Sequence, residues 1–252
     1  MPRIGTRKLQ YLIEDDLKNL GVKMGRDVLF NFLRAENLLI RPKRSYIKTT
    51  NSKHWMKKYP NLIETIPLNR PEQVWVSDIT YIKTDQGHSY LSLVTDAYSK
   101  KIMGYKLSSN LSVDGPLTAL RMAIKARSTQ SNLIHHSDRG LQYCSGEYIK
   151  CLTDHQINIS MTQNGDPYEN AVAERVNGIL KYEFLLVDGF TDENIAAKAI
   201  AQSIAIYNHE RPHLSWNMLT PKKAHQQRGT LRTWNKKPRG KQANRGLLNS
   251  FN

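Results

Sequence analysis

The sequence predicts an α/β protein with a mixed sheet flanked by helices and a small helical module at its N-terminus. Three consecutive segments, residues 74–82, 89–96 and 100–108, are rich in β-branched and aromatic side chains and are expected to form strands. After them, helical and strand-like segments alternate as far as residue 184. Consecutive strands followed by alternating helices and strands indicate a mixed α/β sheet.

Two amphipathic helices are expected at the N-terminus, within residues 6–21 and 24–39. We expect the following apolar side chains of the first helix to face a core: Leu9, Leu12, Ile13, Leu17 and Leu20. Gly21 is typical of the residue that ends a helix. The second helix offers a further apolar set: Val28, Leu29, Phe32 and Leu33.

Basic side chains accompany this second helix and the segment after it: Arg26, Arg34, Lys43 and Arg44. A short connection followed by a basic helix indicates a helix-turn-helix, whose second helix enters a DNA groove. An α-hairpin that only packs on a neighbouring element is the alternative.

Three acidic residues stand in contexts that would present a carboxylate. Asp78 interrupts a largely apolar strand face, where an unpaired charge is costly. Asp138 lies at the tip of a second strand, just before a glycine turn, and Glu174 lies in an amphipathic helix at residues 169–184. Carboxylates from two strands and one helix could converge on one point, and hard divalent cations prefer oxygen ligands. For any one of the three alone, an ordinary solvated or capping role is the alternative.

Charge is distributed unevenly along the 252 residues, whose net charge is +15. Residues 1–58 carry 14 basic and 5 acidic side chains, residues 59–210 carry 13 and 17, and residues 211–252 carry 10 and none. The basic flanks would therefore hold a polyanion with an affinity that falls as salt rises. For the last segment, a merely solvated run of charge is an equal alternative.

Four motifs occur together along the chain: WVSDITYI, HHSDRGLQY, GDPYENAVAERVNGILKYE, and YNHERPH followed by TPKKA. In order and spacing they resemble the transposases of the insertion-sequence-three family, which are relatives of the retroviral integrases. The similarity runs from about residue 6 to about residue 227. Thirty-five residues separate Asp138 from Glu174, the spacing for which this group is known, and Lys181 stands where the family carries a basic residue.

The resemblance implies a ribonuclease-H-like fold and a DDE transposase of the orfB type. In such an enzyme Asp78, Asp138 and Glu174 hold two Mg²⁺ ions, with Mn²⁺ as a substitute, and the chemistry suits cleavage of a phosphodiester. The implied reaction is cleavage at the 3′ ends of an insertion sequence, followed by strand transfer into new DNA.

The family pattern also suggests DNA contacts. The helix that carries Glu174 places Asn170 and Lys181 on the same polar flank, and we expect both to face DNA. Arg211, in the YNHERPH motif, is expected either to contact DNA or to cap a helix.

These features divide the chain into four expected parts. They are a DNA-binding module at residues 1–45, a basic linker at 46–70, a ribonuclease-H-like catalytic domain at 71–228 and a basic tail at 229–252. Within the linker, Trp55 and Tyr59 are expected either to stack on bases or to pack against the core.

The expected partners are DNA at the element ends and at the target, further copies of this chain, and a helix-turn-helix protein from an upstream reading frame. Because Met1 lies close to the start of the helical module, the alternative is an inactive or partner-dependent DNA-binding fragment that acts as a repressor. A plain ribonuclease fits less well, because the basic flanks would be surplus.

The remaining sequence features concern location and cysteine chemistry. No apolar stretch approaches the roughly 20 residues that span a membrane, and no signal-peptide core is visible, so we expect a bacterial, cytoplasmic and nucleoid-associated protein. The two cysteines, Cys144 and Cys151, are expected to be free thiols on one helix. No histidine–cysteine zinc module precedes the sheet.

Overall fold

The computed structural model describes residues 1–40, 55–163 and 170–230. Several predictions fall outside these residues: the DNA contacts of Lys43 and Arg44, most of the predicted tail, and most of the polar loop before Glu174.

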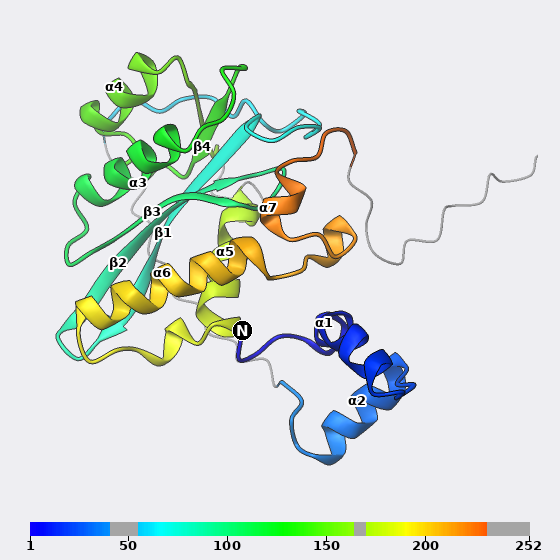
Figure 1. Cartoon of the computed structure of the whole chain (residues 1–252). Helices are drawn as coiled ribbons and strands as arrows, with labels where there is room; N and C mark the ends of the chain where they lie inside the picture. Colours follow the sequence, from blue (N-terminus) through cyan, green and yellow to red (C-terminus); the bar gives the residue numbers. More distant parts are fainter. Residues whose placement is uncertain (41–54, 164–169, 231–252) are drawn as a thin grey trace, which may run out of the picture.

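A five-stranded mixed sheet forms the centre of the molecule (Figure 1). Its strands are β1 (Val74–Thr84), β2 (Gly87–Asp96), β3 (Ile102–Ser108), β4 (Ile134–Ser137) and β5 (Asn158–Met161). Strands β1, β2 and β3 form an antiparallel meander, whereas β4 pairs in parallel with β1, and β5 in parallel with β4. The spatial order is β3-β2-β1-β4-β5, which confirms the predicted mixed sheet.

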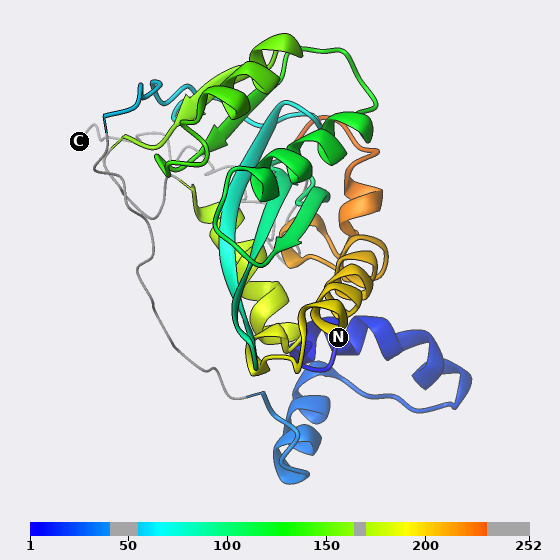
Figure 2. The same cartoon turned by 90° about the vertical axis from the view of Figure 1, so that its left-hand side faces the viewer.

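Helices cover both faces of the sheet (Figures 1 and 2). On one face lie α3 (Asp114–Lys125) and α4 (Gly146–Asp154), and on the other lie α5 (Ala171–Glu183) and α6 (Glu193–His209). Because both faces are covered, neighbouring residues of β1 are buried on opposite sides of the sheet.

Short helical elements complete the C-terminal half of the described chain. They are the 3₁₀ turns η2 (Leu186–Asp188) and η3 (Leu214–Trp216) and the helix α7 (Pro221–Ala224). The side chain of Thr220 caps α7 by accepting a hydrogen bond from the Lys223 N–H.

The N-terminal module consists of α1 (Thr6–Asn19) and α2 (Arg26–Ala35). As predicted, Gly21 follows the end of α1, and its φ of +68° suits a residue without a β-carbon. The Val22 N–H donates to the Leu17 carbonyl over 2.8 Å, which closes the last turn.

The predicted apolar core of this module is only partly formed. Leu29 and Leu33 of α2 are buried, but Leu12, Leu20, Val28 and Phe32 are exposed, Leu20 to 76% and Phe32 to 51%. The expectation that Leu12 and Leu20 face a core is therefore wrong. Two short helices have too little facing surface to cover all of their apolar side chains.

Two polar contacts attach the module to the end of α5. The Arg3 N–H donates to the Glu183 carbonyl over 3.1 Å, and Lys8 Nζ lies 3.0 Å from Glu183 Oε1. Lys8 is buried as a result, although lysine is rarely found inside a protein.

The described part of the predicted linker, residues 55–70, lies against the sheet domain. Tyr59 packs against the core beneath α3 and α4, and the Met161 N–H donates to the Pro60 carbonyl over 3.2 Å. Trp55 is 92% exposed, so its predicted packing against the core is not seen.

The cysteine prediction is partly wrong. Cys144 and Cys151 are both free and buried. However, Cys144 precedes α4, because Ser145 caps that helix by accepting a hydrogen bond from the Tyr148 N–H. Within the described segments, no helix has the length and apolar character needed to cross a membrane.

Candidate active site

Asp78 and Asp138 emerge at the carboxyl ends of two neighbouring parallel segments. The pairing of β1 with β4 ends where Ser77 lies opposite Ser137, and the next residue on each strand is an aspartate. Neighbouring strands lie roughly 4.8 Å apart, so continuing the register sets the two carboxyl groups beside each other. Ligands of open α/β sheets bind at this edge.

Glu174 approaches the same place from α5, which packs against β1 and carries Glu174 in its first turn. Its side chain is exposed, but its charge acts on Asp78. Burial, Asp138 and Glu174 together raise the pKa of Asp78 to about 7. Three carboxylates are thus gathered where no cation balances them in the protein.

The electrostatics agree with a cation site that is incomplete in the protein alone. Within the described residues, no three His, Cys, Asp or Glu side chains converge closely enough to hold a metal ion. Three carboxylates are nevertheless the oxygen donors that Mg²⁺ prefers, and a divalent cation would remove the repulsion that raises the Asp78 pKa.

Asn177 is a residue of this site that the sequence analysis missed. Its side-chain amide donates to Oδ2 of Asp78 over 2.7 Å, and its own side chain is buried. It lies three residues after Glu174, on the same side of α5. That spacing was a usable signal, because residues three apart on a helix share a face.

Lys181 lies beside the carboxylates, two turns beyond Glu174. Burial lowers the pKa of its ammonium group, and the nearby Asp78 charge partly opposes this effect. The prediction that Glu174 and Lys181 share a flank is confirmed, since both act on Asp78.

The turn after β4 restrains Asp138. The Gly140 N–H donates to Asp138 Oδ1 over 2.9 Å. A β-carbon at Gly140 would stand 3.0 Å from the same oxygen, so the absence of a side chain lets the turn close on the carboxylate. Tyr143, whose N–H donates to the Gly140 carbonyl, lies buried below this turn.

The two histidines before Asp138 have structural contacts. Nε2 of His135 lies 2.8 Å from Ser77 Oγ and 2.9 Å from the Tyr148 hydroxyl, whereas Nδ1 of His136 lies 2.8 Å from Ser160 Oγ. Burial lowers the pKa of His135 to about 3, so this ring is neutral. The pair therefore ties β4 to β1, α4 and β5 instead of forming a metal site.

The structure corrects two predicted DNA contacts. Asn170 is buried, and its amide donates to the Ser77 carbonyl over 3.1 Å, which fixes the start of α5 against β1. Arg211 is only 2% exposed, and its Nε and Nη2 each donate to a Glu183 oxygen over 2.8 Å. Side chains that are buried and paired with protein groups are not available to a phosphate.

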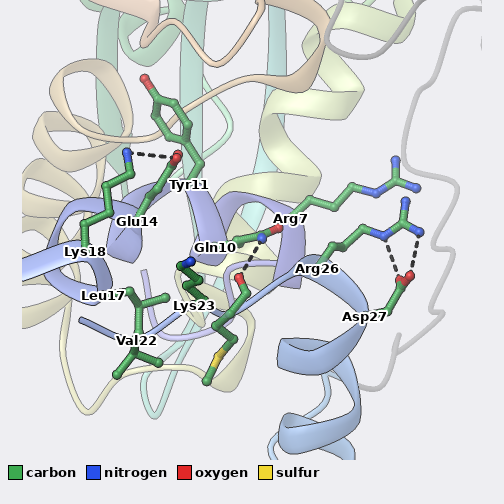
Figure 3. A pocket seen from close by; sticks show the side chains of 11 residues that line it. Arg7, Gln10, Tyr11, Glu14, Leu17, Lys18, Val22, Lys23, Arg26 and Asp27 are labelled. Carbon is green, nitrogen blue, oxygen red and sulfur yellow. Dashed lines mark hydrogen bonds and ion pairs between the residues drawn. The ribbon is translucent and has the colours of Figure 1, made fainter. Parts of the chain in front are cut away.

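Two other predicted DNA contacts, Arg26 and Arg34, remain on the surface of α2. Arg26 is ion-paired with Asp27 over 2.8 Å, and the Arg34 guanidinium lies 4.8 Å from the centre of the Phe30 ring. Arg26 also borders a pocket of about 580 Å³ between α1 and α2. Figure 3 shows the Arg7 and Arg26 side chains extending to the same side of this pocket in that view.

Comparisons with known proteins agree with this geometry. Two models described as "Integrase core domain" match residues 69–167 and 155–221. An uncharacterized 31 kDa protein of insertion element IS600 from Shigella sonnei is 35% identical over 219 residues, which are 86% of this chain and 79% of that protein. Transposase InsF for insertion sequence IS3A from Escherichia coli is 32% identical over 206 residues, 81% of this chain and 71% of the relative.

This chain belongs to the IS3 family of transposases.

The fold has solved counterparts. A simian T-cell lymphotropic virus intasome in complex with PP2A regulatory subunit B56 gamma contains a chain with a TM-score of 0.55 and 19% identity, covering 94% of this transposase and 79% of that chain. The HTLV-2 integrase catalytic core domain in complex with magnesium gives a TM-score of 0.50 and 20% identity, covering 62% and 97%. The ribonuclease-H-like fold is therefore confirmed.

Family membership also decides between the functions that the sequence left open. This IS3-family transposase is a polynucleotidyl transferase, as predicted. The comparisons favour that function over an inactive DNA-binding repressor.

Proposed function

We propose that this transposase cleaves the 3′ ends of an insertion sequence and joins them to target DNA, with Asp78, Asp138 and Glu174 holding two Mg²⁺ ions. The proposal rests on the register of β1 and β4, which sets the two aspartates beside each other at the carboxyl edge of the sheet. The influence of Glu174 on Asp78 supports its place as the third ligand.

When bound, the cations would activate the attacking hydroxyl group and neutralise charge on the scissile phosphate and the leaving oxygen. The side chains of the protein prepare this site. Asn177 holds one oxygen of Asp78 and leaves the other for a ligand, and the Gly140 N–H does the same for Asp138. Outer contacts of this kind fix the direction of a metal-binding carboxylate.

Two further side chains have roles in this proposal. Glu174 is exposed in the first turn of α5, so it is open to an incoming DNA strand. Lys181 presents an ammonium group next to the carboxylates, where it would contact a phosphate beside the reacting one.

DNA recognition is assigned to the N-terminal module. Arg26 and Arg34 of α2 remain on its surface, and residues 1–58 carry a large excess of positive charge. We infer that this module, with the following segment, forms a unit distinct from the catalytic domain at residues 71–228. We also propose that the transposase works as a homo-oligomer, because two element ends must be held together, and that an upstream-frame helix-turn-helix protein assists it.

The test is cleavage of a duplex that ends in the element's terminal repeat, with Mg²⁺ titrated from zero. Asp138→Asn should abolish cleavage and leave duplex binding at low salt within about twofold of the wild-type protein. The matched control is Asp154→Asn, which changes an exposed aspartate paired with Lys150 on α4 and should cleave normally. Cleavage retained by Asp138→Asn would reject the assignment.

A further inference from the structure

A second cavity, of about 370 Å³, lies on the N-terminal side of α5 away from the carboxylates. Its walls come from α1, α5 and residues 211–215. Apolar side chains of α5 form part of the wall, and the other notable members are cations and one imidazole: Lys8, Lys100, Arg175, Arg211 and His213.

This cavity has more positive than negative charge. Glu183 pairs with both Lys8 and Arg211, over 3.0 and 2.8 Å. Asp96 acts on Lys100 from a distance, but in the described part of the chain no carboxylate lies within ion-pair distance of Lys100 or Arg175. One paired carboxylate therefore faces four cationic side chains.

His213 shows that these charges surround one point. It is 7% exposed, and within the described residues its Nε2 has no hydrogen-bond partner. Burial lowers the pKa of His213 to about 2, and Arg211, Lys8, Lys100 and Arg175 all act in the same direction. A neutral imidazole with a buried and unpaired ring nitrogen is costly unless a ligand completes its hydrogen bonding.

The helix α5 separates this cavity from the carboxylates. Successive residues of an α-helix turn by roughly 100°, so Arg175 and Ile179 point away from the side on which Glu174 and Asn177 lie. A group bound in the cavity is therefore not the phosphate that reacts.

We propose that this cavity is an anion site that binds a phosphate group of the DNA backbone, away from the reacting bond. The inference rests on the proposed function, because DNA is the phosphate source that it requires. Arg175 at the rim and Lys100 further in would donate charge-assisted hydrogen bonds, and His213 would complete its own hydrogen bonding. Lys8 comes from α1, so a bound phosphate would also strengthen the attachment of the N-terminal module to the catalytic domain.

The first test measures binding of a 30-base-pair duplex of random sequence at several salt concentrations, without divalent metal. Each lost phosphate contact lowers the slope of log affinity against log salt by about one. We expect that loss for Arg175→Ala, which changes an exposed side chain and should fold. Arg175→Lys should keep the slope, and so should the control Arg121→Ala on α3, across the sheet. An unchanged slope in Arg175→Ala, or an equal loss in Arg121→Ala, would overturn the DNA assignment.

The second test uses inorganic phosphate without DNA and compares melting temperatures with chloride at equal ionic strength. Phosphate should raise the melting temperature of the wild-type protein and not that of Arg175→Ala. A rise in both proteins, or in neither, would overturn the anion site itself. A rise in the wild-type protein alone, with no change of slope, would make free phosphate the source. Both tests contain no metal, so they can be interpreted even if the cleavage test of Asp138→Asn fails.

Discussion

Asn177 donates its side-chain amide to Oδ2 of Asp78 over 2.7 Å and so joins the helix that carries Glu174 to the central strand. Asn177→Ala should lower the cleavage rate roughly 10- to 100-fold and raise the Mg²⁺ concentration needed for half-maximal rate, because Asp78 loses its orientation. Rate against Mg²⁺ concentration measures both. Asn158→Ala, which removes an exposed amide contact to Asn132, is the control and should change neither. A normal Mg²⁺ requirement in Asn177→Ala would contradict the role.

Gly140 tests how closely the turn fits around Asp138. In Gly140→Ala the new β-carbon would meet Asp138 Oδ1 at 3.0 Å, so the carboxylate must move by a few tenths of an ångström. We expect a loss of cleavage of at least tenfold with a change in the free energy of unfolding below about 1 kcal/mol. At Gly146 a β-carbon would meet nothing within 4 Å, so Gly146→Ala should leave cleavage intact. Equal activity in the two variants would show that the turn tolerates the shift.

Arg211 should matter for stability. Arg211→Ala leaves Glu183 half-buried with Lys8 as its remaining partner, and removing one member of a buried pair costs about 3 kcal/mol. Urea unfolding followed by tryptophan fluorescence measures the change. Lys150→Ala breaks an exposed pair with Asp154 and should cost less than about 1 kcal/mol. A small loss in both variants would return Arg211 to the list of surface contacts.

His225 makes the stability of the domain depend on pH. Its Nε2 lies 3.4 Å from Glu72 Oε1 and its Nδ1 lies 3.6 Å from Asp96 Oδ1, and both carboxylates are fully buried. Burial alone would lower the pKa of His225, but hydrogen bonds to the two carboxylates raise it, against a smaller opposing effect of Lys101. Burial likewise opposes ionisation of Glu72, yet hydrogen bonds from His225, Ser128 and Thr129 lower its pKa to about 2.

The sign of the effect follows from the raised pKa of His225. The folded protein holds this proton more tightly than the unfolded chain, so the stabilisation is complete below pH 6.5 and is lost as pH rises through the folded pKa. The free energy of unfolding should fall over that window in the wild-type protein and stay flatter in His225→Gln. His88→Gln, on the exposed part of β2, is the control and should keep the wild-type profile. Parallel profiles in all three proteins would contradict the prediction.

The sequence predicted those parts of the molecule that depend on local pattern. All five strands and the helix of Glu174 follow periodic runs, and Asp78 and Asp138 could be placed at strand positions from their neighbours alone. The neighbouring placement of the two aspartates needed more, because only the parallel pairing of β1 with β4 brings residues sixty apart together.

The errors arose where a distant partner decides the surroundings of a side chain. Arg211 has the appearance of a surface cation until Glu183, 28 residues earlier, is seen to hold it. Asn170 has a polar helix position, but it faces the backbone of Ser77. In the N-terminal module, the apolar period of α1 and α2 was read correctly, yet it does not reveal how little surface opposes Leu20 or Phe32.

The position of β1 in the sheet has a consequence for biosynthesis. Its pairing with β2 and β3 is local, whereas its pairing with β4 closes a loop of about fifty residues and is expected to form later. A growing chain that has released only the meander owns Asp78 without Asp138. Such a nascent enzyme is catalytically silent until translation has delivered both β4 and α5, and this delay protects nearby DNA from a half-made nuclease.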